Sequence, residues 1–377
     1  MAKCIRVELS IGSPTWTVVS QEGRIVEPVE EYLRFLRNRN DSPNTVRAYG
    51  TSLAQFWNYL ERIDVKWIDV DLGQLAGFMD AVRFGEIDSN VFQFSAAPVV
   101  SESTVRLRVA AVQSFYRYFK RQGLEVAEFL PTEGARGHHY KPFLQGIGKA
   151  RNPRRSPLRM ALKTREVTVL RPDQVEALIS GEDDPRYRLL WQLLSDSGLR
   201  LAEALMLQHR DWRLGAGSTA AVQVPDRQHP LGLRAKSGSR KVLVSEATDV
   251  LYTDLIEWLC SNGADIEIPD NQWDELFIFC NVYRGKRWGP LSPQSVYDHL
   301  ERRKAHDSAI PQEMTPHWLR HTHATRLLLQ GVRPLIVSRR LGHSSIQTTL
   351  DIYAHITELS EEEALEKLVE YGKRKEA

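Results

Sequence analysis

Hydrophobic residues in the first third of the chain recur at three- and four-residue spacing, which is the spacing of one face of an α-helix. The first run ends at Leu60 and follows Ser42, a typical helix-capping residue placed before a proline. Two further runs cover residues 72–82 and 101–119, and Ser101 marks the start of the second of these. The pattern therefore predicts a helical domain over residues 27–125.

Residues 1–26 show a different and weaker pattern, an alternation with a period of two. Ile5, Val7 and Leu9 are separated by single residues, and a polar step further on ends at Gly23. Alternation of this kind is typical of strands, and glycine is typical of turns. We predict an N-terminal extension that forms a short β-hairpin.

The second half of the chain, residues 167–377, mixes both patterns. An apolar helix ends at Gly198, short strands are predicted at 221–224 and 241–245, and the pattern is helical again from Pro316. A chain of 377 residues is too long for one compact core. The expected fold class is mainly α with a small β-sheet (α+β), built as two domains.

Between the two domains, residues 126–166 have an unusual composition. From Arg136 to Arg171 there are ten Lys or Arg residues and one acidic residue, Glu166, with Gly, Pro and His interspersed. This pattern favours an extended basic interdomain linker that lies near phosphate groups. The alternative is a plain disordered connector.

Overall composition excludes several classes of protein. The chain is 42% hydrophobic and 26% charged with a net charge of +2, so any DNA-binding surface must be a local patch. Cys4, Cys260 and Cys280 are far apart, form no Cys-x-x-Cys motif and suggest a reducing cytosol. The N-terminus has no apolar signal-peptide core, and no stretch approaches the roughly 20 apolar residues of a membrane span. We expect a cytoplasmic protein without a membrane partner.

Four short blocks in the second half carry the candidate chemistry: Gly198–Glu203, His317–His321, Leu341–His343 and Tyr353–His355. Arginine is a fork-shaped donor suited to a phosphate diester, and histidine moves protons near neutral pH. Tyrosine can be a covalent nucleophile. No Asp/Glu cluster accompanies these residues, which predicts phosphate chemistry with no metal and no other cofactor.

Each block also has a plainer interpretation. Arg200 and Glu203 have the spacing of an ordinary ion pair within a helix. His317 and His321 have metal-ligand spacing, although the glutamate of the His-Glu-x-x-His motif is missing. Lys236 lies in a polar turn between the predicted strands, where it is either an exposed tip or a proton donor to a leaving oxygen.

In this order the blocks resemble the tyrosine recombinase (phage integrase) family, whose members include transposon-encoded site-specific recombinases. The resemblance covers the helical segment from about residue 27 and all of residues 167–377, and it implies a core-binding domain and a catalytic domain that form a clamp on DNA. One departure is the segment 215–236, which is longer than a minimal hairpin. By the family pattern, with Glu203 in support, the catalytic residues are Arg200, Lys236, His317, Arg320, His343 and Tyr353.

The resemblance also implies the reaction and the partners. Tyr353 would form a 3′-phosphotyrosyl bond with duplex DNA, without ATP, on the way to a Holliday junction. A homotetramer on two DNA sites is expected, with a dimer on each site and accessory recombination proteins as further candidate partners. An exchange helix at about 359–372 would dock on a neighbouring subunit, and the alternative is packing against its own subunit. The alternatives are a type IB topoisomerase that relaxes DNA and a DNA-binding regulator that does not cut.

Two groups of basic residues are candidates for contacts with DNA phosphates. For the group in the third helix the alternative is an ordinary solvated face. The helical group is Arg106, Arg108, Arg117, Lys120 and Arg121, and the linker group is Arg136, Lys141, Lys149, Arg151, Arg154 and Arg155.

Overall fold

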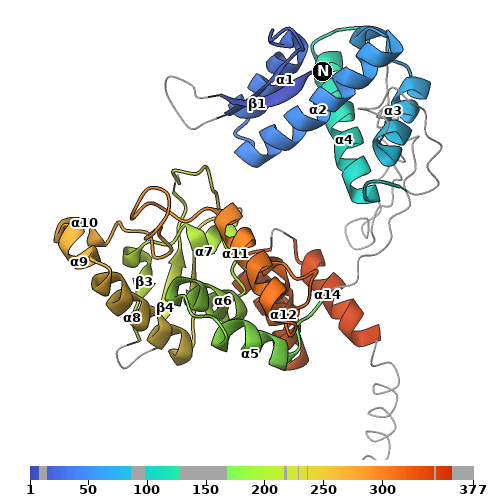
Figure 1. The fold of residues 1–377 in the computed structure, drawn as a ribbon. Coiled ribbons are helices and arrows are strands. Elements are labelled where there is room, and N and C mark those ends of the chain that lie inside the picture. Colours follow the sequence, from blue (N-terminus) through green and yellow to red (C-terminus); the bar gives the residue numbers. More distant parts are fainter. Residues whose placement is uncertain are drawn as a thin grey trace, which may run out of the picture. The chain divides into compact units, whose positions relative to one another are not determined.

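In the computed structural model the chain divides into two compact units, Met1–Thr164 and Arg165–Ala377 (Figure 1). The described residues are 1–7, 15–85, 98–126, 168–215, 219–227, 229–235, 237–343 and 345–358, with side chains as far as Ile352 in the last helix. Over these residues the fold is mainly helical with two small antiparallel sheets, which confirms the predicted fold class.

The first unit is a helical domain with a two-stranded sheet at its N-terminus. Its elements are β1 (Lys3–Val7), β2 (Thr15–Val19), α1 (Glu27–Asn38), α2 (Pro43–Ile63), the 3₁₀ helix η1 (Trp67–Asp69), α3 (Leu72–Phe84) and α4 (Glu102–Arg121).

Both helix starts read from the sequence of this unit are confirmed by the capping geometry. The side chain of Ser42 accepts a hydrogen bond from the backbone N–H of Thr45 at the start of α2. Ser101 does the same for Thr104 at the start of α4. Each bond satisfies one of the backbone donors that the first helical turn leaves without a partner.

The N-terminal strands belong to the core of the first unit. β1 and β2 are antiparallel and both pack against α2, and the side chain of Val18 is completely buried. Asn58, on α2, exchanges hydrogen bonds with the backbone of Ala2. α2 also packs against α1 and α4 around aromatic side chains such as Phe56 and Phe115. Burial of this kind is the main source of stability in a helical domain.

The second unit contains a short three-stranded antiparallel sheet with the order β3-β4-β5. Its elements are α5 (Pro172–Ser180), α6 (Pro185–Ser197), α7 (Leu201–Leu205), the 3₁₀ helix η2 (His209–Asp211), β3 (Trp212–Arg213), β4 (Ala221–Val224), β5 (Arg240–Leu243), α8 (Glu246–Ser261), α9 (Ala264–Glu267), α10 (Asp270–Trp273), α11 (Pro293–His306), α12 (Pro316–Leu329), α13 (Pro334–Leu341) and α14 (Gln347–Glu358).

The central helix of the second unit is α6, which packs against α8 and α12. Its apolar residues include Leu190, Trp191 and Leu194, all completely buried. A helix that is hydrophobic on most of its faces needs neighbours on most sides, and this one has them. Its position fixes where the chain goes after Gly198.

Gly198 ends α6 in the left-handed conformation, with φ of 66°. A Cβ atom at this position would lie 2.4 Å from Leu341 Cδ2 and 2.7 Å from His323 Cδ2. Glycine is therefore required both by the backbone and by the close approach of the neighbouring side chains. The turn delivers Arg200 next to α12 and the end of α13.

A small apolar cluster joins the last three helices of the described chain. Ala324 and Leu328 of α12, Val337 and Leu341 of α13, and Ile352 of α14 are all buried in it. Three of the four blocks with candidate chemistry therefore lie on, or directly after, helices that pack against each other (Figure 1).

Two predicted segments fall on residues that the structure does not describe, apart from residue 126 at the start of the first. They are the basic linker, with its six candidate DNA contacts, and the exchange helix at about 359–372. Within the described part of the chain, none of the helices has both the length and the apolar character needed to cross a membrane.

Candidate active site

Side chains from the start of α7, from α12, from the end of α13 and the turn after it, and from α14 converge on one pocket of about 140 Å³. Four of the six predicted catalytic residues line this pocket. The lining residues are Arg200, His317, Arg320, His321, Ala324, Leu341, His343, Thr348 and Ile352.

Arg200 precedes the first turn of α7, and its guanidinium is fixed by partners on three segments. Nη1 donates to Glu203 Oε1 at 2.9 Å and to Ser237 Oγ, and Nη2 donates to the carbonyl of Gly342 at 3.1 Å. The side chain is still 27% exposed. A fixed but accessible guanidinium can bind an anion without first being ordered.

Glu203 is the carboxylate that organises this side of the pocket. It is fully buried, and it pairs with Arg240 at 2.8 Å as well as with Arg200. Burial alone would raise the pKa of this carboxyl, but the hydrogen bond and charge of Arg240, together with Arg200, lower the pKa to about 2. The ordinary ion pair expected as an alternative exists, but it is one part of a buried network.

Arg320 lies on α12 and is almost completely buried, at 3% exposure. Nη1 donates to the carbonyl of Gly198 at 2.7 Å and Nη2 to the carbonyl of Leu341 at 2.8 Å. Burial, followed by the nearby charge of Arg200, lowers the pKa of the guanidinium to about 9. The group therefore remains charged at neutral pH, and its carbonyl partners orient that charge without neutralising it.

Three histidines share the pocket. The rings of His317 and His321, one helical turn apart on α12, are nearly perpendicular with centroids 4.4 Å apart. Nδ1 of His343 is 2.8 Å from Thr349 Oγ1. Burial, with the charges of Arg320 and Arg200, lowers the pKa of His343 to about 4. His343 is therefore neutral near pH 7, and as a neutral imidazole it offers one N–H donor.

The described part of the chain contains no group of three or more His, Cys, Asp or Glu side chains arranged to hold a metal ion. His317 and His321, which have metal-ligand spacing, line the pocket together with Arg200 and Arg320. Two cationic guanidiniums beside a pair of histidines suit an anion better than a second cation.

Two predicted catalytic side chains lie outside the described residues, namely Lys236 and the side chain of Tyr353. The backbone of Tyr353 belongs to α14, directly after Ile352, whose side chain lines the pocket. Ser237, directly after Lys236, contacts both Arg200 and Glu203. The neighbours of both residues therefore belong to the site, while their catalytic roles stay predictions.

Sequence reasoning did not assign a role in the site to Ser237, Arg240 or Thr349. Arg240 and Ser237 reach Glu203 across more than thirty residues of sequence, so no local spacing reveals the contact. Thr349 could have been found as the polar residue six positions after His343, but that spacing is not specific.

The nearby His323 has a structural role. Nδ1 of His323 donates to the carbonyl of Ser195 at 3.0 Å, and Nε of Arg340 donates to Nε2 of His323 at 3.0 Å. Burial, with the charge of Arg340, lowers the pKa of His323 to about 4. The ring of this neutral histidine packs against Gly198, and it does not line the pocket.

The helical group of candidate DNA contacts lies on α4 in the first unit. Arg106, Arg117, Lys120 and Arg121 are exposed, and Arg108 is half-buried. The opposite face of α4 packs in the core of that unit. The helix therefore offers a basic face to solvent, and its contact with DNA stays a prediction.

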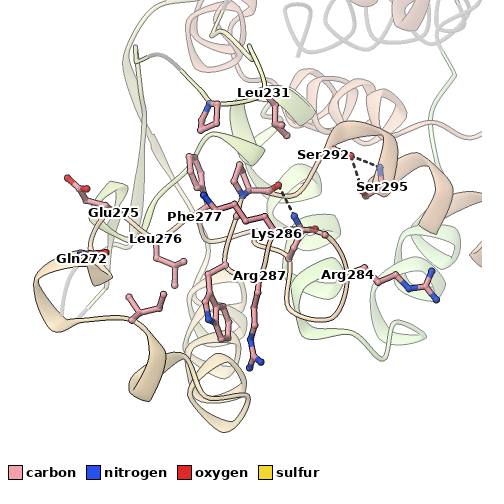
Figure 2. A pocket seen from close by; sticks show the side chains of 17 residues that line it. Leu231, Gln272, Glu275, Leu276, Phe277, Arg284, Lys286, Arg287, Ser292 and Ser295 are labelled. Carbon is pink, nitrogen blue, oxygen red and sulfur yellow. Dashed lines mark hydrogen bonds between the residues drawn. The ribbon is translucent and has the colours of Figure 1, made fainter. Parts of the chain in front are cut away.

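A larger pocket of about 770 Å³ lies elsewhere in the second unit (Figure 2). Leu231, Phe277 and Lys286 are among its lining residues, and it shares none of them with the arginine and histidine pocket. Among the predicted catalytic residues whose side chains the structure describes, none lines it. The larger volume of this pocket is therefore no reason to assign it to the candidate chemistry.

Comparison with known proteins gives consistent matches along the chain. The model of the phage integrase family matches residues 168–359, and the model of the phage integrase N-terminal SAM-like domain matches residues 29–123. The chain is 30% identical over 366 residues to transposase A from transposon Tn554 of Staphylococcus aureus, which covers 96% of each protein. It is 28% identical over 332 residues to the tyrosine recombinase XerC of Roseiflexus castenholzii, covering 88% of this chain and 89% of that one.

Among solved structures, the fold is similar to that of the Tn1549 transposon integrase in complex with a circular intermediate DNA. The TM-score is 0.57 at 20% sequence identity, covering 90% of this chain and 99% of that chain. At this identity the likeness concerns the fold, and it extends over both units.

Proposed function

Because the chain belongs to the phage integrase family and is a site-specific DNA recombinase, we propose that the arginine and histidine pocket cuts and rejoins duplex DNA through Tyr353. One observation carries this assignment to the pocket. Arg200, Arg320 and a neutral His343 converge on a single small space, and Ile352, the residue before Tyr353, lines the same space.

In the proposed reaction the oxygen of Tyr353 attacks the scissile phosphorus, and the bond from phosphorus to the 5′ oxygen breaks. The tyrosine proton passes to His317, and Lys236 supplies a proton to the departing 5′ oxygen. The 3′-phosphotyrosyl bond replaces the diester bond one for one. Rejoining is the reverse attack by a 5′ hydroxyl, so ATP is not consumed.

Charge grows on the non-bridging phosphate oxygens during the attack. Arg200 and Arg320 would bind these oxygens, because both guanidiniums are already fixed by protein partners and need no reorganisation. His343 would donate a neutral hydrogen bond to the phosphate. In this scheme the arginines do the work that a metal ion does in other phosphate-cutting sites.

Assembly is the less direct part of the proposal. We propose that the two units clamp DNA in the cytoplasm, that one dimer binds each site and that a homotetramer exchanges strands through a Holliday junction, with or without accessory proteins. Support comes from the named relatives, a transposase and a recombinase, and from an integrase solved on a circular DNA intermediate. A mobile element such as a transposon fits these relatives best.

The test is a covalent-trapping experiment on duplex fragments that the protein itself selects from random DNA. A nick near the cleavage point lets the short fragment that carries the departing 5′ hydroxyl diffuse away. Rejoining is then impossible, and the enzyme stays covalently attached to the cut DNA. Wild-type protein should give an adduct in denaturing electrophoresis in the presence of EDTA. Tyr353→Phe should bind the same DNA and give none, because only the attacking oxygen is missing.

Two results would refute the assignment. An adduct formed by Tyr353→Phe would exclude this tyrosine as nucleophile. Cleavage that stops with EDTA and returns with zinc or magnesium would favour a metal held by His317 and His321.

A further inference from the structure

The hairpin that follows Lys236 is tied to the pocket by two side chains. Ser237 Oγ donates to Glu203 Oε1 at 3.2 Å and accepts from Arg200. Arg240 donates to both carboxylate oxygens of Glu203, at 3.2 and 2.8 Å. The same buried carboxylate therefore holds Arg200 on one side and the hairpin on the other.

Arg240 also reaches a third segment. Its Nε donates to the backbone carbonyl of Arg340 at 3.1 Å, two residues before Gly342 and three before His343. Its own backbone begins β5, where it is paired with Val224 of β4. One guanidinium thus connects the sheet, the carboxylate beside Arg200 and the segment that leads into His343.

The contact between the hairpin and the turn after α13 is very close. Gly342 has φ of 66°, and a Cβ atom there would lie 2.6 Å from Ser237 Cβ and 3.0 Å from Arg240 Cζ. The backbone of the Leu341–His343 turn therefore packs against side chains of the hairpin, with no room for a Cβ atom at Gly342.

Neutralising Glu203 does not by itself account for Arg240. Arg200 already pairs with Oε1, and the backbone N–H of Arg200 donates to Oε2 at 3.0 Å. A second arginine adds charge to a site that already holds Arg200 and Arg320, which is unfavourable unless the side chain has a further use. The hydrogen bond from Arg240 to the Arg340 carbonyl, together with its position on the hairpin, indicates that Arg240 also connects these two segments.

We propose that Arg240 is a positioning residue that holds the Lys236 hairpin against Glu203 and the Arg340–His343 segment. The proton donor and the phosphate-binding residues then reach the same diester together. This inference rests on the proposed function, in which Lys236 protonates the departing 5′ oxygen. Arg240 itself touches neither the phosphate nor the leaving group in this scheme.

The proposal makes a selective prediction about the leaving group. A displaced hairpin delays the proton to the 5′ oxygen but leaves the attack by Tyr353 and the arginine contacts in place. A sulfur atom at the 5′ bridging position leaves as a thiolate and needs no proton. Loss of Arg240 should therefore slow cleavage of the oxygen substrate much more than cleavage of the sulfur substrate.

The experiment measures single-turnover covalent cleavage of a nicked duplex, taken from the fragments that wild-type protein selects, with oxygen or sulfur at that position. Arg240→Gln should slow the oxygen reaction by roughly 10²-fold, within the range of a general-acid contribution, and recover most of the rate with sulfur. Arg240→Lys keeps the charge and should fall in between. Arg213→Gln, which removes an exposed arginine from β3 of the same sheet, is the matched control and should change neither rate.

Equal slowing of Arg240→Gln on both substrates would overturn the proposal, because Arg240 would then act through Arg200. Lys236→Ala serves as the reference for the proposed function. If sulfur does not rescue Lys236→Ala, the role of Lys236 as acid fails, and amide hydrogen exchange of residues 238–241 decides about Arg240. Faster exchange there in Arg240→Gln, with exchange in β4 unchanged, would support a positioning role, and unchanged exchange would refute it.

Discussion

On the Arg200 side of the pocket a buried carboxylate lies against the guanidinium, whereas on the Arg320 side both described hydrogen-bond partners are backbone carbonyls. The first arrangement fixes geometry and offsets charge. The second fixes the geometry of Arg320 and leaves its charge without an opposite partner, and burial lowers the pKa of this guanidinium to about 9. A phosphate entering the pocket would therefore gain most from Arg320, and Arg200 would act mainly through its fixed position.

This comparison predicts unequal losses when each arginine is removed. Arg320→Ala should reduce single-turnover cleavage by roughly 10³-fold and Arg200→Ala by roughly 10²-fold, both typical for loss of a preorganised donor to a developing charge. Arg326→Ala, an exposed arginine on the same helix as Arg320, controls for general loss of charge. Thermal melts check that the variants fold. An equal or larger loss for Arg200→Ala would contradict the idea that the carboxylate reduces its contribution.

The carboxylate itself should reveal its role through stability. The pKa of Glu203 is about 2 in the folded protein and about 4.5 ordinarily, so its contribution is present above pH 4.5 and disappears as the pH falls toward 2. Glu203→Gln should lower the free energy of unfolding at pH 7 by about 3 kcal/mol, at 1.36 kcal/mol per pH unit. The difference from wild type should shrink in urea titrations between pH 4.5 and 3.

A surface ion pair provides the control for this measurement. Glu275 pairs with Arg210 at 3.5 Å and is 65% exposed, so Glu275→Gln should cost at most about 0.5 kcal/mol at any pH. A Glu203→Gln difference that stays constant with pH would show that the loss comes from packing and not from the carboxylate charge.

The same comparison shows which parts of the site a sequence can reveal. The sequence predicts the helix boundaries at Ser42, Ser101 and Gly198, and the structure confirms them, because capping and left-handed turns depend on one or two residues. The spacing of His317 and Arg320 likewise places both side chains on one face of α12. These features are local, and local chemistry determines them.

The contacts that distinguish the two arginines are not local. Glu203 accepts hydrogen bonds from Arg240, which is thirty-seven residues away in the sequence. Arg320 donates to the carbonyl of Gly198, which is 122 residues away. Their partners follow from how α6, α12 and β5 pack, which depends on the whole core. The pairing of Arg200 with Glu203 was open to a local interpretation only because the two residues are three apart.

The basic linker offers a further group of cations, with ten Lys or Arg residues and the single carboxylate of Glu166 between Arg136 and Arg171. Changing Arg151, Arg154 and Arg155 to Ala should weaken binding to selected and random duplexes alike. The slope of log affinity against log salt should fall by about 2.7, at roughly 0.9 per phosphate contact. Fluorescence anisotropy at several salt concentrations measures both quantities. A loss confined to the selected sequence would indicate base recognition by these residues.

The smallest expected effect concerns His343, which lines the pocket together with the two arginines. Thr349 is buried and holds Nδ1 of His343 at 2.8 Å, so Thr349→Val keeps the shape but removes the orienting hydroxyl. Loss of one hydrogen bond of about 1 kcal/mol should slow cleavage by about fivefold. In a His343→Ala background the same change should have no effect, because the two residues act on the phosphate through one imidazole. A fivefold loss in both backgrounds would instead assign Thr349 to the packing of α14, and the orientation of His343 would then depend on the Arg200 and Arg320 sides of the pocket alone.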